Sequence, residues 1–451
     1  MNVTPHLARI LVADPQPSFS HELARLLAPY EDQVIWTKSV TATTAHLSRH
    51  RIDLILIDDR MLKKGGAAML DGLLSGEHPH IVLLAEPMSV QEMADLYRRG
   101  VAAVVIKPFH PRELILCLHA LLSRQKRVVC LGGGSGLYTL LLGLKTLPGL
   151  YLTSIVTMSD DGGSSGRLRE SFGILPPGDV RRSLVALSTA PALLNELMHY
   201  RFSGGEGLKD HSLGNLLLTA MADLKGSMAE AVRAMGDVLD IQGTVLPVTT
   251  HLNRLVAQLA DGTVIRGETN IDVPKGRDPR IRIEKVWQEP EPEANPNALS
   301  SILAADLILL GPGDLFTGIV ATLTVKGIRD AVCAARGRTI YLCNLMTKPG
   351  ETSGFTAMDH VAEVVRYLGQ DALDDVLISN TTLAPLALAR YAQNGQDPVR
   401  VDTAGMRAVT RARVLMKDVG SSDELVRHDS MKLAGEIQQL LGTTAPPPRS
   451  R

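Results

Sequence analysis

The chain has 451 residues, of which 45% are hydrophobic and 21% are charged, and this length exceeds what one hydrophobic core usually spans. Its 47 basic and 48 acidic residues give a net charge of −1, which offers no general attraction to nucleic acid or to an anionic membrane. Four cysteines, the lack of a long apolar run and an amino terminus unlike a signal peptide favour a cytosolic protein of two or three packed units.

Residues 7–124 alternate short apolar runs with segments of helical periodicity. This pattern predicts a five-stranded parallel sheet that helices cover on both faces. Asp14, Asp58 and Lys107 stand at the ends of three of these strands, and such ends converge on one crevice in a doubly wound sheet. Two carboxylates and an ammonium at that place suit Mg²⁺ and a phosphoryl group.

This segment resembles a response-regulator receiver domain of the CheY type, with Asp58 at the phospho-acceptor position and Lys107-Pro108-Phe109 as the Lys-Pro signature. The resemblance implies a flavodoxin-like fold, Mg²⁺ held by Asp14 and Asp58, and a histidine kinase or another protein as partner. Two residues depart from the family, because Pro15 stands where a second acid is usual and Ala85 replaces a hydroxyl residue. Two interpretations of Asp58 stay open, a live phospho-acceptor and a structural remnant, and a pseudo-receiver that docks partners or dimerises is a further alternative.

The second part of the chain, residues 127–400, begins with a strand that ends in the turn Gly132-Gly133-Gly134-Ser135-Gly136. A helix follows directly, so the backbone N–H groups of this turn can approach a phosphate without side-chain obstruction. Counted from Gly132, the third glycine of a Gly-x-Gly-x-x-Gly fingerprint would fall on Leu137, so we expect no nicotinamide cofactor. A tight turn without a ligand is the alternative.

Three polar segments follow the next strand. Asp160 and Asp161 lie where related folds bind sugar hydroxyls, and they also suit Mg²⁺, although a loop that caps the next helix is the alternative. Asp179 is predicted to cap a helix whose first turn carries Arg181. A cation in the first turn of a helix is unfavourable for the helix dipole, and a nearby anion would explain its presence. The segment around His211 opens a further helix, and that residue is either a ligand contact or a structural residue.

Residues 240–290 change to alternating runs around Asp261-Gly262, which is a strong β-hairpin signal, so we expect a small antiparallel insertion there. The parallel pattern then resumes, and two more strands end in polar loops, the first at Gly311-Pro312-Gly313 and the second around Asn344 and Thr347. Four polar loops after four strands must face the same sheet edge. One ligand crevice explains them better than four unrelated turns.

Six ordered blocks in this part resemble the YvcK (gluconeogenesis factor) branch of the CofD-like family: LGGGSGL, SDDGGSSGRLR, FGILPPGDVR, HSLGNLLL, LGPGDLFT and CNLMTKPGETSGFTAMDHV. The resemblance implies a Rossmann-like α/β domain that binds a UDP-sugar such as UDP-N-acetylglucosamine, with roles in cell shape and in growth on gluconeogenic carbon sources. The related CofD enzymes transfer phospholactate, so a phosphotransferase that uses Mg²⁺ at Asp160 and Asp161 is the alternative. The chain departs from the family at Asp314, an added carboxylate beside a phosphate turn.

We therefore expect a regulator that binds a UDP-sugar behind a receiver and forms a homo-oligomer. The predicted ligand contacts are Gly132, Gly133, Gly134, Ser135, Gly136, Asp160, Asp161, Gly162, Gly178, Asp179, Arg181, His211, Asn215, Gly311, Pro312, Gly313, Asn344 and Thr347. Residues 401–442 are expected to form a C-terminal helical extension, and the proline-rich residues 443–451 a disordered tail.

Overall fold

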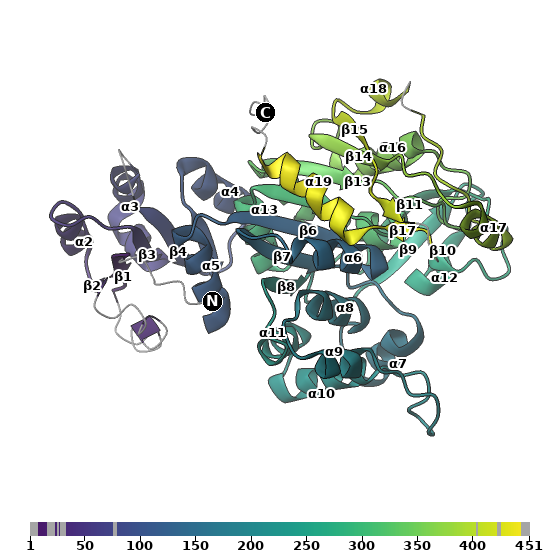
Figure 1. The fold of residues 1–451 in the computed structure, drawn as a ribbon. Helices are drawn as coiled ribbons and strands as arrows, with labels where there is room; N and C mark the ends of the chain where they lie inside the picture. The colour runs from purple at the N-terminus through teal and green to yellow at the C-terminus, as the bar shows by residue number, and fades with distance from the viewer. Residues whose placement is uncertain are drawn as a thin grey trace. The chain divides into compact units, whose positions relative to one another are not determined.

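The computed structural model describes residues 8–15, 23, 24, 27, 33–74, 79–402, 405–421 and 425–442, and the predicted disordered tail lies outside them. The chain divides into two compact units, residues 1–126 and residues 127–451 (Figure 1). Among the described residues, no helix combines the length and the apolar composition that a membrane crossing requires.

The first unit contains a five-stranded parallel sheet in the order β2-β1-β3-β4-β5, which confirms the predicted receiver-like architecture. Its strands are β1 (Ile10–Ala13), β2 (Val34–Thr37), β3 (Leu54–Asp58), β4 (His80–Ala85) and β5 (Ala103–Ile106). Its helices include α2 (Val40–Leu47), α3 (Asp59–Leu73), α4 (Val90–Arg99) and α5 (Pro111–Leu122). The central strands β1 and β3 are buried throughout because both faces of the sheet are covered.

The second unit is built on a seven-stranded sheet in the order β15-β14-β13-β12-β6-β7-β8. Its strands are β6 (Lys126–Gly132), β7 (Leu150–Val156), β8 (Thr244–Pro247), β12 (Leu307–Leu310), β13 (Arg338–Leu342), β14 (Asp375–Ser379) and β15 (Arg413–Lys417). β7 and β8 follow β6 toward one edge of the sheet, and β13, β14 and β15 follow β12 toward the other edge. The order of the strands therefore reverses between β6 and β12, which are parallel neighbours. In open α/β sheets, ligands bind at such a switch point.

Helices of the second unit flank this sheet. Those before the insertion are α6 (Gly134–Leu144), α7 (Gly163–Phe172), α8 (Gly178–Leu187), α9 (Ala192–His199), α10 (Leu213–Lys225) and α11 (Met228–Val238). Those after it are α13 (Pro296–Ala304), the π-helix η2 (Leu315–Val320), α14 (Ala321–Leu323), α15 (Ile328–Ala334), α16 (Ala357–Leu368), α17 (Pro385–Gln393), α18 (Met406–Val409) and α19 (Ser430–Gly442). The C-terminal helix α19 packs along α6, so the end of the chain supports the helix that follows β6 (Figure 1).

The predicted antiparallel insertion is present as a three-stranded sheet in the order β10-β9-β11. It consists of β9 (Arg254–Leu259), β10 (Val264–Arg266) and β11 (Ile283–Glu289), with the short helix α12 (Glu268–Asp272) between β10 and β11. Gly262 in the predicted hairpin turn has φ +87°, a conformation that glycine adopts without strain. The insertion begins at β9, because β8, which lies in the predicted range, pairs with β7 in the main sheet.

The predicted C-terminal helical extension over residues 401–442 also contains strands. Residues 413–417 form β15, an edge strand of the main sheet that pairs in parallel with β14, and residues 420–421 and 427–428 form the small ladder of β16 (Gly420–Ser421) and β17 (Arg427–His428). None of the residues of β15 is fully buried, so this edge strand carries a weak hydrophobic pattern. Only α19 and the short α18 match the predicted helices among the described residues of this range.

Helix α16 begins with a capping box, which supplies a first prediction. The hydroxyl of Thr356 accepts from Asp359 N–H at 3.2 Å, and the carboxylate of Asp359 accepts from Thr356 N–H at 2.8 Å. Thr356→Ala is expected to lower the free energy of unfolding by about 1 kcal/mol, measured by urea denaturation. The control Thr139→Ala removes a hydroxyl that bonds only within its own helix, to Ser135 O, and is expected to change it by less than about 0.5 kcal/mol. Equal losses in both variants would contradict the capping role.

Candidate ligand site

Two glycine-rich turns meet at the switch point of the seven-stranded sheet. We call residues 132–136 the first glycine turn and residues 311–313 the second glycine turn. Gly311 N–H donates to Leu131 O at 3.0 Å, and a Cβ on Gly136 would lie only 2.4 Å from Pro312 O. A Cβ on Gly313 would lie 3.2 Å from Gly133 O. The two turns are therefore in backbone contact, an approach that a side chain at residue 136 would prevent.

Three helices, α6, α7 and α8, begin beside one another at this edge. Their N-cap residues are two glycines and a proline, and no N-cap side chain bonds to the first turn of any of the three. A Cβ on Gly133 would lie 2.4 Å from Asp179 Oδ2 of α8, and a Cβ on Gly178 would lie 2.4 Å from Ser165 Oγ of α7. A Ser, Asn or Thr side chain caps α10, α11, α13 and α16, whereas α9, α15 and α17 also lack such a bond. Gly134 N–H of α6 donates to the Asp179 carboxylate. The other first-turn N–H groups of these three helices, with their partial positive charge, suit an anion.

Asp160 and Asp161 hold the loop after β7 against its neighbours. Asp160 Oδ1 accepts from Gly162 N–H at 2.9 Å, and its Oδ2 would lie 2.9 Å from a Cβ on Gly178. Asp161 Oδ1 accepts from Thr269 N–H at 2.8 Å, at the start of α12. Asp161 thus fixes the helix of the β insertion beside the glycine turns, which the sequence did not predict. Both aspartates are partly exposed.

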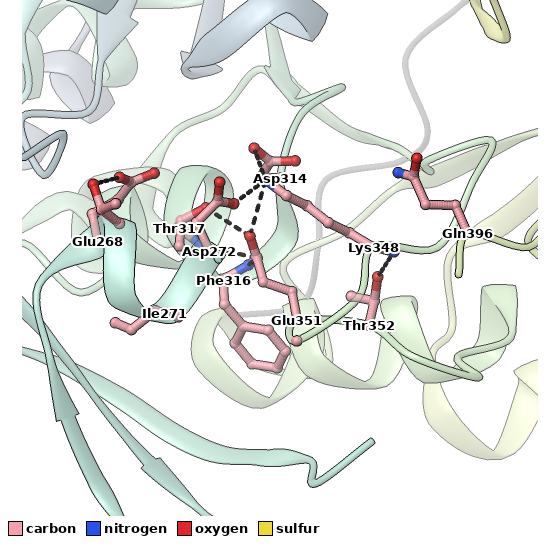
Figure 2. A network of polar contacts seen from close by, with 12 residues as sticks. Glu268, Ile271, Asp272, Asp314, Phe316, Thr317, Lys348, Glu351, Thr352 and Gln396 are labelled. Atoms are coloured by element: carbon pink, nitrogen blue, oxygen red, sulfur yellow. Dashed lines mark hydrogen bonds and ion pairs between the residues drawn. The ribbon is translucent and has the colours of Figure 1, made fainter. Parts of the chain in front are cut away.

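A lysine surrounded by three carboxylates lies next to the second glycine turn (Figure 2). Lys348 Nζ lies 2.8 Å from Asp314 Oδ2 and 3.5 Å from Glu351 Oε1, and it also contacts Asp272 Oδ1. Asp314 directly follows the second glycine turn, Asp272 ends α12, and the other two residues lie in the loop after β13. This ion-pair cluster joins three segments that are far apart in the sequence.

Glu351 is the most buried member of this cluster, with a side chain that is 0% exposed. Its Oε2 accepts from Phe316 N–H at 2.9 Å and Thr317 N–H at 3.3 Å, and its Oε1 accepts from the Thr317 hydroxyl at 2.9 Å. Glu351 therefore caps the start of η2. Burial raises the pKa of Glu351 to about 7, and the neighbouring carboxylates add to this effect while Lys348 opposes it.

Two further carboxyl groups of the site have raised pKa values. Burial, with the charges of Asp160 and other carboxylates nearby, raises the pKa of Glu268 to about 9. Burial also raises the pKa of Asp179 to about 6, although Gly134 N–H donates to this carboxylate and favours its charged form. Burial thus shifts the titration of all three carboxyl groups toward neutral pH or above it. Carboxyl groups held in this range can donate as well as accept protons and hydrogen bonds.

Arg181, His211 and Asn215, all predicted contacts, form a buried network behind the start of α7. Ser164 Oγ lies 3.0 Å from His211 Nδ1 and accepts from Asn215 Nδ2 at 3.1 Å, and Arg181 Nε donates to Asn215 Oδ1 at 2.8 Å. Burial lowers the pKa of Arg181 to about 10 and also lowers that of His211. These side chains fix Ser164 in the first turn of α7, and their contact with a ligand stays a prediction.

The two predicted contacts after β13 differ in their surroundings. Thr347 is tied to its own loop, because its N–H donates to Asp397 O at 2.7 Å and its Oγ1 accepts from Asp397 N–H at 2.9 Å. The Oδ1 atom of Asn344 is buried and has no hydrogen-bond partner among the described residues. Asn344 follows β13, the neighbour of β12, whose end carries the second glycine turn. Its contact with a ligand stays a prediction.

In the first unit, the predicted residues Asp58 and Lys107 meet, with Lys107 Nζ 2.8 Å from Asp58 Oδ2. Arg60, which the sequence analysis did not single out, also contacts Asp58, with Nε 2.7 Å from Oδ1, and reaches Asp14 Oδ1 at 3.4 Å. Burial acts to raise the pKa of Asp58, but hydrogen bonds from Arg60 and Lys107 outweigh it and lower the pKa to about 2. Arg60 therefore contacts both predicted aspartates of this crevice, and Lys107 contacts Asp58.

Comparison with known proteins agrees with both units. Residues 128–443 match the sequence model of 2-phospho-L-lactate transferase CofD, which covers more than half of the chain. The chain belongs to the CofD family. Residues 10–119 match the response regulator receiver domain. The gluconeogenesis factor of Halalkalibacterium halodurans is 40% identical to this chain over 316 residues, which cover 70% of this chain and 96% of that protein. The gluconeogenesis factor of Bacillus subtilis is 37% identical over 321 residues, which cover 71% of this chain and 99% of that protein.

Solved structures show the same relationship. A crystal structure of a UPF0052-family protein from Bacillus halodurans is 39% identical and has a TM-score of 0.66. The match covers 70% of this chain and 99% of the Bacillus halodurans chain. The gluconeogenesis-factor branch of the CofD family is therefore fused here to a receiver domain.

Glu268, Asp272 and Lys348 were not predicted from the sequence, and neither Asp314 nor Glu351, which lies in the predicted loop after β13, was predicted as a contact. Lys348 and Glu351 lie in the same loop as the predicted Thr347, so the polar character of that loop was the available signal. No such signal exists for Glu268 and Asp272. They reach the site only because the β insertion brings α12 against Asp161.

Proposed function

We propose that this CofD-family chain is a regulator that binds a UDP-sugar such as UDP-N-acetylglucosamine. The supporting observation is that α6, α7 and α8 begin side by side without a side-chain bond from their N-cap residues, next to two glycine turns at the switch point of the sheet. N–H groups of this kind suit the two phosphates that link a nucleoside to a sugar. With the family we associate roles in cell shape and cell-wall metabolism, and in growth on gluconeogenic carbon sources.

Magnesium is part of this proposal because the anion site has acidic neighbours. Asp179 Oδ2 would lie 2.4 Å from a Cβ on Gly133, Asp160 Oδ2 would lie 2.9 Å from a Cβ on Gly178, and Asp314 directly follows the second glycine turn. A diphosphate placed there without a cation would be repelled. Carboxylate oxygens are the ligands that Mg²⁺ prefers, and the exposed part of Asp160 and Asp161 fits such an ion. Bound Mg²⁺ would neutralise diphosphate charge, while the helix N-termini orient the phosphates.

Calorimetric titration of the full chain with UDP-N-acetylglucosamine, UDP and GDP tests this proposal. Saturable binding of both uridine ligands is expected, tighter with Mg²⁺ than with EDTA, and weaker for GDP. Lack of binding by either uridine ligand in the presence of Mg²⁺ would contradict the proposal. The variant Asp314→Asn serves as a probe of the acidic neighbours and is expected to reduce the advantage that Mg²⁺ gives.

A phosphotransferase of the CofD type is the second candidate function. It is favoured by the carboxyl groups of Asp179, Glu268 and Glu351, whose raised pKa values place proton transfer within reach near neutral pH. Product formation from a nucleotide-activated phospholactate, abolished in Asp161→Asn, would establish the enzyme. Saturable binding without turnover supports the regulator.

The remaining expectations concern the cellular setting. We propose a cytosolic protein that forms a homo-oligomer and meets a protein partner through its receiver unit. Light scattering coupled to size exclusion tests the oligomer, and a mass of about one chain, 48.6 kDa, would exclude it.

A further inference from the structure

We propose that the guanidinium of Arg60 takes the place of the divalent cation of a receiver, so that Asp58 accepts neither a metal ion nor a phosphoryl group. The inference concerns the first unit alone and does not depend on the ligand proposed for the second. It rests on the contacts of Asp58, on those of Asp14, and on the balance of charge around them.

The carboxylate of Asp58 has no acceptor position left. Its Oδ1 accepts from Arg60 N–H at 2.9 Å and from Arg60 Nε–H at 2.7 Å. Its Oδ2 accepts from Arg60 Nη2 and from Lys107 Nζ, each at 2.8 Å. A carboxylate offers about four lone-pair sites, and all are used here. Because the side chain is only 1% exposed, neither oxygen can attack a phosphorus atom or bind a metal ion unless an ion pair first breaks.

The second predicted metal ligand is engaged by the same group. Arg60 Nη2 lies 3.4 Å from Asp14 Oδ1, so one guanidinium contacts both carboxylates between which Mg²⁺ is expected. Pro15 offers no side-chain oxygen for the ion. Mg²⁺ requires near-octahedral oxygen ligands at about 2.0–2.1 Å, and a charge-assisted, bidentate arginine is a strong competitor for them. The residues present therefore do not fit the metal.

Local structure fixes this arginine in place. Asp58 is the N-cap of α3, and Arg60 is in the first turn of that helix. The same carboxylate thus caps the helix through the backbone of Arg60 and binds its side chain, which leaves the guanidinium over Asp58.

The charges around Asp58 are balanced without a metal ion. Lys107 bridges Asp58 and Asp59, with Nζ 3.0 Å from Asp59 Oδ1, and Lys63 Nζ lies 2.8 Å from Asp59 Oδ2. Among the described residues, the ion pairs around Asp58 join three carboxylates and three cations: Asp14, Asp58, Asp59, Arg60, Lys63 and Lys107. An added divalent cation would bring excess positive charge into a partly buried site.

Iron-directed cleavage of the full chain tests the proposal locally. Fe²⁺ substitutes for Mg²⁺, and with ascorbate and peroxide it cuts the backbone close to where it binds. We expect no cuts near residues 14 and 58 in the wild type or in Arg60→Lys. Arg60→Asn, which frees the carboxylates, is expected to gain cuts there that excess Mg²⁺ suppresses and that Arg60→Asn/Asp58→Asn lacks. Thermal melts followed by circular dichroism verify that each variant is folded.

Mg²⁺-suppressible cuts near residues 14 and 58 in the wild type would overturn the proposal, and so would a folded Arg60→Asn that gains none. A second measurement needs no variant at Arg60. Acetyl phosphate with Mg²⁺ is expected to leave the wild type without a hydroxylamine-labile label. Stoichiometric labelling that Asp58→Asn abolishes would also overturn the proposal.

Discussion

Lys348→Met is expected to lower the free energy of unfolding by about 3 kcal/mol at pH 8, because removing one partner of a buried ion pair leaves uncompensated charge. Lys348 is the cation that contacts Asp272, Asp314 and Glu351, and the Glu351 side chain is 0% exposed. Without the ammonium, three carboxylates face one another beside the second glycine turn. Urea denaturation of the full chain, followed through the transition of the second unit, measures the loss.

The pH dependence of this loss has a definite sign. The pKa of Glu351 is about 7 in the folded chain, against an ordinary value of 4.5, so the folded state binds more protons than the unfolded state between these values. Stability therefore falls as the pH rises through this window. Lys348 opposes the rise in the pKa of Glu351, so its removal is expected to extend the window upward and to make the loss at pH 8 larger than the loss at pH 5.

Two controls separate this effect from a general loss of surface charge. Lys326→Met removes an exposed ion pair with Glu293 and is expected to cost less than about 1 kcal/mol. Adding Glu351→Gln to Lys348→Met is expected to restore part of the lost stability at pH 8, because it removes one of the unpaired carboxylates. A loss in Lys348→Met that matches the one in Lys326→Met at every pH would contradict the role of Lys348.

Gly136→Ala is expected to weaken binding of UDP-N-acetylglucosamine by about tenfold or more, which corresponds to ~1.4 kcal/mol. The new Cβ would lie 2.4 Å from Pro312 O and 2.7 Å from Pro312 C, both backbone atoms. The two glycine turns must then separate, and overpacking of this kind also costs about 1–3 kcal/mol of stability. Calorimetry and a thermal melt report the two effects.

Gly435→Ala is the matched control, because Gly435 is also a helical glycine and a Cβ there would meet nothing within 4 Å. This substitution is expected to leave affinity unchanged and to stabilise the chain by about 0.5–1 kcal/mol. Unchanged affinity in a folded Gly136→Ala would show that contact between the two turns is not needed for binding.

The convergence of the two glycine turns could be predicted from sequence because each follows an apolar strand, and parallel strands end at the same sheet edge. The sequence also indicated the hairpin at Asp261-Gly262, whose turn chemistry is local. β8 was assigned to the insertion because it directly precedes the hairpin in sequence, and β15 is too exposed for periodicity to identify it. Propensity and pattern act over a few residues, whereas both strands owe their pairing to the rest of the sheet.

The ion-pair cluster around Lys348 could not be predicted from the sequence. Asp272, Asp314 and Lys348 belong to an insertion helix, a turn and a distant loop, so only the folded chain brings them together. Arg60 is different, since it lies two residues after Asp58 and the geometry of a helix start places it over that carboxylate. The contact between Arg60 and Asp58 could therefore have been predicted from the sequence. The sequence interpretation of the receiver rested on Pro15 and Ala85 instead.

The central claim is that the helix N-termini beside the two glycine turns hold the diphosphate of a UDP-sugar. A crystal structure of the full chain with UDP-N-acetylglucosamine and Mg²⁺ tests it most directly. The account predicts phosphate oxygens within hydrogen-bond distance of first-turn N–H groups of α6, α7 or α8, next to the second glycine turn. A nucleotide sugar bound elsewhere on the chain, with these N–H groups left to solvent, would contradict it.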